Sequence, residues 1–332
     1  MMIFLKISTN PPGQIRLLLF VSLLMATGSL FSNGEHASDT KGEDITWYAF
    51  DWLPSGSHSN LENPQAIMRI HPAIEGLPGL KGFQLCIDVA DSYLYESAFN
   101  SLLWRKPDLE DKIIRLHAAG RTQTRVLNEA EVIIDGDMIG YNDFRVIDSR
   151  NEPEDSGISG FLGYNFLRAI RKILIIDHQN SRFALLDVLP ENWENEAHLV
   201  RMQASPSFLG LRIRANGKSI RLSFDGESTP ALVLYRNRDF GNIASERSVP
   251  DSLRYFYPQS NRYIMLEGRA PKADLYFGPY KLKSHNVYLM PERDRRLGSD
   301  RGLITQPFFQ DYILIIDFKN DRFGIVTPTV LD

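Results

Sequence analysis

A phrase that occurs twice constrains the fold of this 332-residue chain more than any other feature. Residues 173–183 read ILIIDHQNSRF and residues 313–323 read ILIIDFKNDRF, so eight of eleven positions are identical at an offset of 140 residues. ILII is a β-branched, apolar run that is typical of a strand buried on both faces. The polar residues after it suit a tight turn, and RF begins a return strand. Each copy therefore predicts a β-hairpin.

The residues before the two hairpins correspond as well. GFLGYNFLRAIRK begins at Gly160 and GLITQPFFQDY begins at Gly302, and each leads from a glycine into a short amphipathic segment. Further upstream, the alternating strands in FQLCIDVADS and IRLSFDGEST end at Asp88 and Asp225, which are 137 residues apart. The agreement of this offset with that of the hairpins predicts an internal duplication, in which one β-rich lobe is used twice.

Within each lobe the pattern is almost entirely β. Residues 131–148 contain an Asp-Gly turn between apolar runs, and residues 211–224 contain an Asn-Gly turn between alternating strands, which is a strong hairpin signal. Hydrophobic residues make up 43% of the chain, enough to bury a sizeable core. The predicted fold class is all-β, with two homologous β-barrel lobes, a cleft between them and few short helices.

The N-terminus has the features of an export signal. Lys6 and Arg16 precede the apolar run LLLFVSLLM, and Ala26-Thr27-Gly28 supplies the small residues of a cleavage site. The sequence therefore predicts a periplasmic or extracellular protein with no stable membrane span after processing. The alternative is that the signal stays uncleaved and anchors the chain in a membrane through residues 15–31.

The domain organisation follows from the signal and the repeat. Between the lobes, the segment PENWENEAH is polar, is led by a proline and has no strand pattern. The expected parts are a signal peptide (1–28), a polar leader with little core of its own (29–63), an N-terminal lobe (64–189), a linker (190–204) and a C-terminal lobe (205–332).

Two aspartates at matched strand ends suggest a pair that faces across the cleft. Two carboxylates about 3 Å apart cannot both ionise, so one retains a proton. The ionised partner can then activate a water, while the protonated partner donates to a peptide carbonyl oxygen. Asp88 and Asp225 are therefore the candidate catalytic residues for peptide hydrolysis without a metal, a cofactor or a covalent intermediate.

The strand–Asp units and the half-ends together resemble the aspartic proteases, either bilobal and pepsin-like or a fused pair of retropepsin-like halves. The resemblance covers residues 65–328 and implies an endopeptidase with an Asp dyad. The chain departs from the family motif, in which Asp is followed by Thr or Ser and then Gly: CIDVADS has Val89 and Ala90, and SFDGEST has Gly226 and Glu227. Thr305 also replaces a downstream glycine. Acidic Asp91 and Glu227 are expected to raise the apparent pKa values of the dyad.

Two functions follow from these residues. The first is an exported aspartic endopeptidase, and the second is a catalytically inactive protein of the same fold that binds a peptide or protein in the cleft. The net charge of −4 gives no electrostatic reason to expect a nucleic-acid partner, and the seven histidines have no metal-ligand spacing. Cys86 is the single cysteine and stands between apolar residues, so we expect a buried, inert thiol. The segment from His117 to Gly120 is either a plain turn or the tip of a β-hairpin flap of the kind the family carries.

Overall fold

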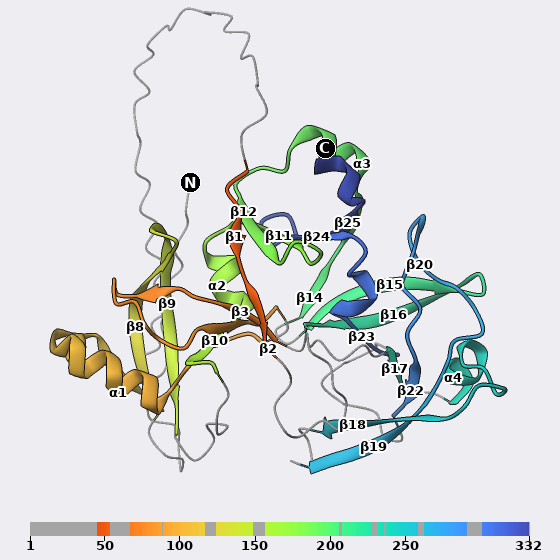
Figure 1. Ribbon diagram of the computed structural model, residues 1–332, viewed down its shortest axis with the longest axis horizontal. Helices are drawn as coiled ribbons and strands as arrows, with labels where there is room; N and C mark the ends of the chain where they lie inside the picture. The colour runs from red at the N-terminus through yellow and green to blue at the C-terminus, as the bar shows by residue number, and fades with distance from the viewer. Residues whose placement is uncertain are drawn as a thin grey trace, which may run out of the picture. The chain divides into compact units, whose positions relative to one another are not determined.

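The computed structural model describes residues 45–53, 67–87, 89–116, 124–148, 157–205, 208–226, 232–235, 237–257, 262–290 and 301–331. The signal peptide expected at residues 1–28 and most of the expected leader lie outside these residues. Residues Gly42–Asp332 form one compact unit. Strands predominate over short helices in the described segments, so the chain is mostly β, as the sequence predicts (Figure 1).

The described strands form three sheets, which we name the central, N-terminal and C-terminal sheets. The central sheet has the order β1 (Tyr48–Ala49), β12 (Arg182–Leu186), β11 (Ile173–Asp177), β24 (Ile313–Asp317), β25 (Arg322–Val326) and β13 (His198–Arg201). The N-terminal sheet has the order β2 (Asp51–Leu53), β3 (Ile67–Ile70), β5 (Phe83–Leu85), β10 (Gly160–Leu162), β6 (Ser92–Tyr95), β9 (Asp137–Ile147), β8 (Thr124–Ile134) and β4 (Ala73–Ile74), with β7 (Ile113–Leu116) also paired to β8. The C-terminal sheet has the order β18 (Asp251–Tyr257), β19 (Arg262–Arg269), β22 (Val287–Leu289), β17 (Leu232–Leu234), β23 (Gly302–Thr305), β16 (Lys218–Asp225), β15 (Phe208–Ala215), β20 (Leu275–Phe277) and β21 (Tyr280–Lys281), with β14 (Gln203–Ser205) also paired to β15. The α-helices are α1 (Glu96–Arg105), α2 (Tyr164–Ala169), α3 (Glu191–Glu196) and α4 (Asn237–Ile243), and the 3-10 helices are η1 (Pro107–Lys112), η4 (Gln306–Phe309) and η5 (Pro328–Leu331).

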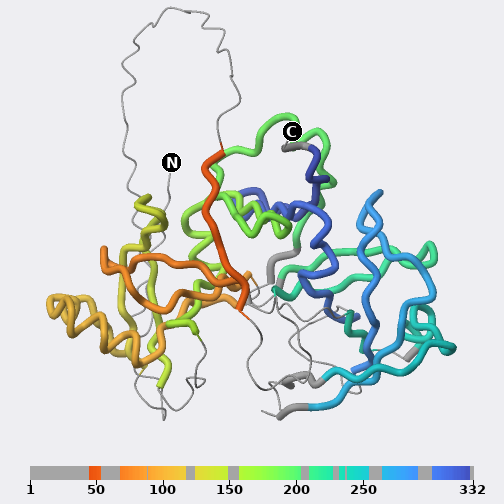
Figure 2. Tube along the Cα trace, in the orientation of Figure 1, coloured from red at the N-terminus to blue at the C-terminus, as the bar shows by residue number. Residues whose placement is uncertain are grey.

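The repeated phrase pairs with itself at the middle of the central sheet. Strands β11 and β24 are antiparallel, with Ile175 opposite Ile315 at the centre of the ladder. Asp177 is opposite Ile313 at one end, and Ile173 is opposite Asp317 at the other, so the pairing is symmetric about its midpoint. Figure 2 shows this meeting of a green segment with a blue one. All residues of both strands are buried, which explains why ILII lacks the alternation of a half-exposed strand.

The turns that follow the two strands share one hydrogen-bond pattern. Asp177 accepts a hydrogen bond from Arg182 Nε at 2.8 Å, and Asp317 accepts one from Arg322 Nε at 3.0 Å. The asparagine three residues after each aspartate donates its side-chain amide to the same carboxylate, at 2.8 Å in both turns. Because a buried carboxylate is costly unless it is paired, these donors account for the D-x-x-N-x-R spacing in both copies.

Each hairpin gains a third strand from a segment that the sequence analysis assigned elsewhere. Strand β1 pairs with β12, and β13 pairs with β25. Beyond these strands, Phe50 N–H donates to the carbonyl of Ser181 at 3.0 Å, and Met202 N–H donates to the carbonyl of Asp321 at 2.7 Å. Residues 45–53, expected to belong to a leader without a core, therefore contribute buried Tyr48 and Phe50. The expected linker likewise contributes α3 and β13.

One pairing pattern occurs in both outer sheets. Strand β10 lies between β5, to which it is parallel, and β6, to which it is antiparallel. Strand β23 lies in the same way between β16 and β17. A Cβ on Gly160 would lie 2.0 Å from the carbonyl oxygen of Tyr93, and a Cβ on Gly302 would lie 2.0 Å from that of Val233. Both glycines are therefore required by the same close approach of a neighbouring backbone.

The hairpins predicted from turn residues are present. Strands β8 and β9 are joined through Asp135 and Gly136, which have φ values of 49° and 92°. Strands β15 and β16 are joined through Asn216 and Gly217, with φ values of 49° and 73°. Positive φ at both central residues is the requirement of a type I′ turn, which explains why the Asp-Gly and Asn-Gly pairs were informative.

The two hairpin turns differ at a buried position. His178 follows Asp177, whereas Phe318 follows Asp317. The His178 ring stacks on Trp52 with a centroid distance of 6.1 Å, and its Nε2 accepts a hydrogen bond from the Gln306 amide. Burial lowers the pKa of His178 to about 4, although Asp177 and the backbone of Tyr312 favour the protonated ring.

The glycine requirement is testable by adding one methyl group. We expect Gly160→Ala and Gly302→Ala each to lower the free energy of unfolding by about 2–4 kcal/mol, because the methyl group displaces a backbone carbonyl. Chemical denaturation measures the change. Gly241→Ala in α4 is the control: a Cβ there has no neighbour within 4 Å, so this variant is expected to be unchanged or up to about 1 kcal/mol more stable. Equal stability of all three variants would contradict the packing described.

The low pKa of His178 predicts stability that is lost in mild acid. In the unfolded chain the imidazole titrates near its ordinary pKa of 6.5, and in the folded protein it titrates near 4. The stabilisation is therefore complete above pH 6.5 and is lost as the pH falls toward 4. We expect wild type to lose about 2 kcal/mol more than His178→Phe between pH 7 and pH 5, as measured by urea unfolding. Phenylalanine is the residue of the second hairpin, so the substitution keeps an aromatic ring that the turn accommodates. Parallel pH profiles for the two proteins would contradict this account.

Candidate active site

The C-terminal sheet places Asp225 at the end of β16. Strand β16 buries Ile220, Leu222 and Phe224 on one face, and Asp225 is the last strand residue, opposite Thr305 of β23. Its side chain belongs to the buried set, with 9% of the residue exposed. A carboxylate at this depth is not the solvated turn residue that an aspartate after a strand most often is.

The N-terminal junction is described on both sides of Asp88, which itself lies outside the described residues. Before it, Cys86 N–H donates to the carbonyl of Leu162 at 2.9 Å, which extends the pairing of β5 with β10. After it, the carbonyls of Val89 and Ala90 accept hydrogen bonds from the first two backbone N–H groups of α2, at 2.9 and 3.0 Å. The loop that contains Asp88 is therefore held between a strand and a short helix.

The position three residues after each of the two glycines differs between the sheets. A Cβ on Gly163 would lie 2.6 Å from the carbonyl oxygen of Ala90 and 2.5 Å from that of Asp91. In the C-terminal sheet the matching position is Thr305, the last residue of β23, which is 3% exposed. The backbone carbonyls that leave no room for a side chain at Gly163 are therefore a feature of the N-terminal junction, because the matching position in the C-terminal sheet accommodates a threonine.

Strand register identifies which residue of the N-terminal junction matches Asp225. Gly160 is opposite Phe83, and the register of β16 with β23, continued by one residue, sets Gly302 opposite Leu222. Counting three residues along each strand leads from Phe83 to Cys86 and from Leu222 to Asp225. The residue that matches Asp225 in register is therefore Cys86, and Asp88 lies two positions beyond it.

The downstream strands support this match. Leu94 of β6 and Leu234 of β17 are equivalent, because they are the partners of Gly160 and Gly302. Asp225 precedes Leu234 by nine positions, Cys86 precedes Leu94 by eight, and Asp88 precedes it by only six. Counting nine residues back from Leu94 leads to Leu85, which is one residue before Cys86 and three residues before Asp88. The match of Asp88 with Asp225 rested on the alternating strands before the two aspartates and on their offset of 137 residues.

Cys86 is a buried thiol, as the sequence predicts. It is 2% exposed and lies between Leu85 and Ile87, which are also buried. A thiol in apolar surroundings is neither an accessible nucleophile nor a substitute for a carboxylate. Within the described residues, no group of three His, Cys, Asp or Glu side chains is arranged to hold a metal ion.

The acidic residue nearest the N-terminal junction has a cationic partner. Asp91 lies 3.1 Å from Arg145 Nη2 and 3.4 Å from the Asn165 side-chain amide. The sequence analysis treated Asp91 as an uncompensated negative charge beside the dyad. Because Arg145 offsets that charge, Asp91 adds less negative potential beside the expected dyad than the sequence alone suggests. The corresponding expectation for Glu227 lies outside the described residues.

Each outer sheet contains a further antiparallel hairpin. Strands β7 and β8 pair from Ile113 opposite Leu127 to Leu116 opposite Thr124. The connecting segment, which includes the expected flap tip at 117–120, lies outside the described residues. Strands β18 and β19 form the hairpin of the C-terminal sheet. The sequence analysis did not single out this second hairpin.

Comparison with known proteins leaves the family of the chain open. No protein-family model matches it, and no curated protein matches it either. In the part of the chain that the structure describes, no helix has the length and apolarity needed to cross a membrane.

The burial of Cys86 predicts protection from thiol reagents. We expect the native protein to react with an aromatic disulfide reagent at least about 100-fold more slowly than the protein in denaturant, because reaction requires local or global opening. Asn100→Cys, which adds a thiol at an exposed position of α1, is the control and should release one equivalent rapidly. Fast labelling of wild type would show that Cys86 is accessible.

Proposed function

We propose that this chain is an exported protein of the aspartic-protease type whose two lobes bind an extended peptide segment between them without cleaving it. The lobes are those predicted from the sequence, with their beginnings moved back to include β1 and β13. The N-terminal export signal and the cleft between the two lobes are predictions from the sequence, and the proposal includes both.

The observation that carries the proposal is the match of Cys86 with Asp225. Hydrolysis through a shared proton requires two carboxylates, one ionised and one protonated, within about 3 Å of each other. The repeated pairing supplies two equivalent strand ends, but only one of them has a carboxylate at the register position. A buried thiol at the other end lacks the acidity and the second oxygen that the mechanism uses.

The repeated strand pairing supports the bilobal arrangement in this proposal. In each outer sheet, the strand that leads to Cys86 (β5) or ends at Asp225 (β16) lies parallel to a strand that begins with a glycine. That glycine-led strand lies antiparallel to the strand after the loop. Both glycine-led strands are followed by a short helix, α2 or η4, and then by a strand of the central sheet. This repeated order of elements is what supports two lobes of like construction in the proposal.

The second candidate function is the aspartic endopeptidase, with Asp88 and Asp225 as its dyad. The observation that favours it is the burial of Asp225 at the end of β16. Burial of a carboxylate costs free energy, and such a cost is common where the residue is catalytic. In this function Asp88 must reach Asp225 from a position two residues beyond the register match.

Incubation with a mixed peptide library between pH 3 and pH 8 separates the two functions. We expect wild type to retain a subset of peptides saturably and to leave all of them intact at every pH, because the dyad is incomplete. Mass spectrometry of the bound and free fractions measures retention and cleavage together. Asp225→Asn should retain the same subset, because the change removes a charge and preserves the shape of the side chain.

The endopeptidase gives a different pattern. Wild type would then cleave, and both Asp88→Asn and Asp225→Asn would abolish cleavage while remaining folded. A wild-type protein that neither cleaves nor retains any peptide would contradict both functions.

A further inference from the structure

Arginines gather on the solvent-facing side of the β15–β16 hairpin. Along β15, Ile213 is buried, whereas its neighbours Arg212 and Arg214 are exposed. Along β16, Ile220 is buried and Arg221 is partly exposed. Because side chains alternate between the faces of a strand, Arg212, Arg214 and Arg221 project from the same face, which we name the arginine face.

The arginine face places like charges next to one another. Arg212 and Arg221 are direct cross-strand partners, and Arg214 is opposite Ser219. Like charges in directly opposite positions destabilise a sheet unless neighbouring groups offset them. Within the described residues, neither Arg212 nor Arg214 forms an ion pair with a carboxylate.

One guanidinium of the face is fixed in position. Arg214 Nη2 donates to the carbonyl of Gly278 at 3.2 Å, and its guanidinium carbon lies 5.9 Å from the centre of the Tyr276 ring. Fixing an arginine in this way lowers the entropy lost when its remaining N–H groups bind an anion. Arg214 is therefore prepared to bind a carboxylate.

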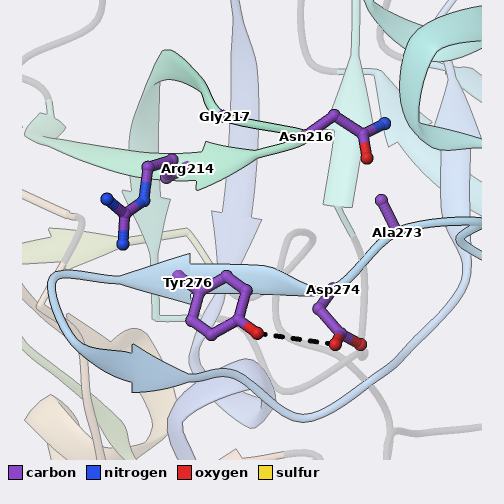
Figure 3. Close-up of a pocket in the computed structure, with 6 residues that line it drawn as sticks. All are labelled: Arg214, Asn216, Gly217, Ala273, Asp274 and Tyr276. Atoms are coloured by element: carbon purple, nitrogen blue, oxygen red, sulfur yellow. Dashed lines mark hydrogen bonds between the residues drawn. The ribbon is translucent and has the colours of Figure 1, made fainter.

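A pocket of about 400 Å³ adjoins the fixed arginine. Arg214 and Tyr276 line it together with the Asn216-Gly217 turn, and Figure 3 shows these side chains around it. The acidic residue of the pocket, Asp274, is already bound by Lys281 Nζ at 2.9 Å and by the Tyr276 hydroxyl at 3.5 Å. These two contacts partly offset the charge of Asp274. Asp274 therefore repels an incoming anion less than a free carboxylate would.

We propose that the arginine face binds an extended acidic peptide segment of a partner protein, with the pocket receiving the end of that segment. Residues two apart on a strand are about 6.8 Å apart, so Arg212 and Arg214 match carboxylates at alternate positions of an extended chain. Arginine binds carboxylates through two parallel hydrogen bonds, which adds geometric selectivity. The chain as a whole has a net charge of −4, so a local positive surface orients an acidic partner that the rest of the molecule repels. This surface does not depend on the proposed cleft.

The probe is a fluorescent twelve-residue peptide of alternating Glu and Thr, titrated with the full-length mature protein and followed by anisotropy. The test variant combines Arg212→Gln, Arg214→Gln and Arg221→Gln. The control variant combines Arg115→Gln, Arg201→Gln and Arg247→Gln, which removes the same charge from exposed positions elsewhere. We expect the test variant to bind the peptide at least about tenfold more weakly than wild type, because it loses the contacts between the three arginines and the peptide carboxylates. The affinity of the control variant should change by less than about twofold, because that variant keeps these contacts.

Two comparisons make the result decisive. A peptide of alternating Gln and Thr should not bind, and affinity for the Glu peptide should fall as salt increases. Equal weakening in the test and control variants would overturn the proposal, because binding would then reflect net charge alone. Tighter binding of a single-stranded oligonucleotide or of anionic vesicles than of the Glu peptide would also overturn it, by assigning the face to a different class of partner. Circular dichroism of both triple variants confirms that a loss of binding is not a loss of fold.

Discussion

The antiparallel pairing of β11 with β24 is the interaction on which the rest of the structure depends. It joins residues 140 positions apart and buries every side chain of both strands. The pairing is symmetric about Ile175 and Ile315, and several elements near one strand have a counterpart near the other. The paired turns, the third strands β1 and β13, and the two glycine-led strands all stand in this relation.

The same symmetry shows where the two parts differ. Gly160 and Gly302 meet a neighbouring carbonyl at the same distance, whereas Gly163, which also meets backbone, is replaced by Thr305 at the matching position. Positions that touch side chains differ, as with His178 and Phe318 in the turns. The strand ends differ most, with Cys86 in one and Asp225 in the other. The backbone packing at Gly160 and Gly302 is therefore the same in both parts, while the residues at the strand ends differ.

Local patterns predicted much of this fold, and long-range pairing accounts for the remainder. The two hairpins of the repeat and the Asn-Gly turn were predictable because strand period and turn residues are properties of short segments. The third strands were missed because β1 and β13 are short, and it is the pairing with β12 and β25 that makes them strands. The match of Asp88 with Asp225 differs from the register match by two residues for a similar reason. Aspartate is common after strands, so residue type is weak evidence, and register is set by Gly160 and Gly302 far along the chain.

The position of β24 and β25 near the C-terminus affects the order in which the molecule can form. The N-terminal sheet contains β10, and the chain then passes through α2 into β11, whose second partner, β24, is made only when residues 313–317 exist. Until then β11 has one unpaired, fully apolar edge, which is a template for wrong pairing between chains. Contacts between such distant residues also close slowly. A chain interrupted before Ile313 would thus contain a nearly complete first part with the unpaired edge of β11 open to aggregation. The last twenty residues cover that edge and so protect the molecule from aggregation at high concentration.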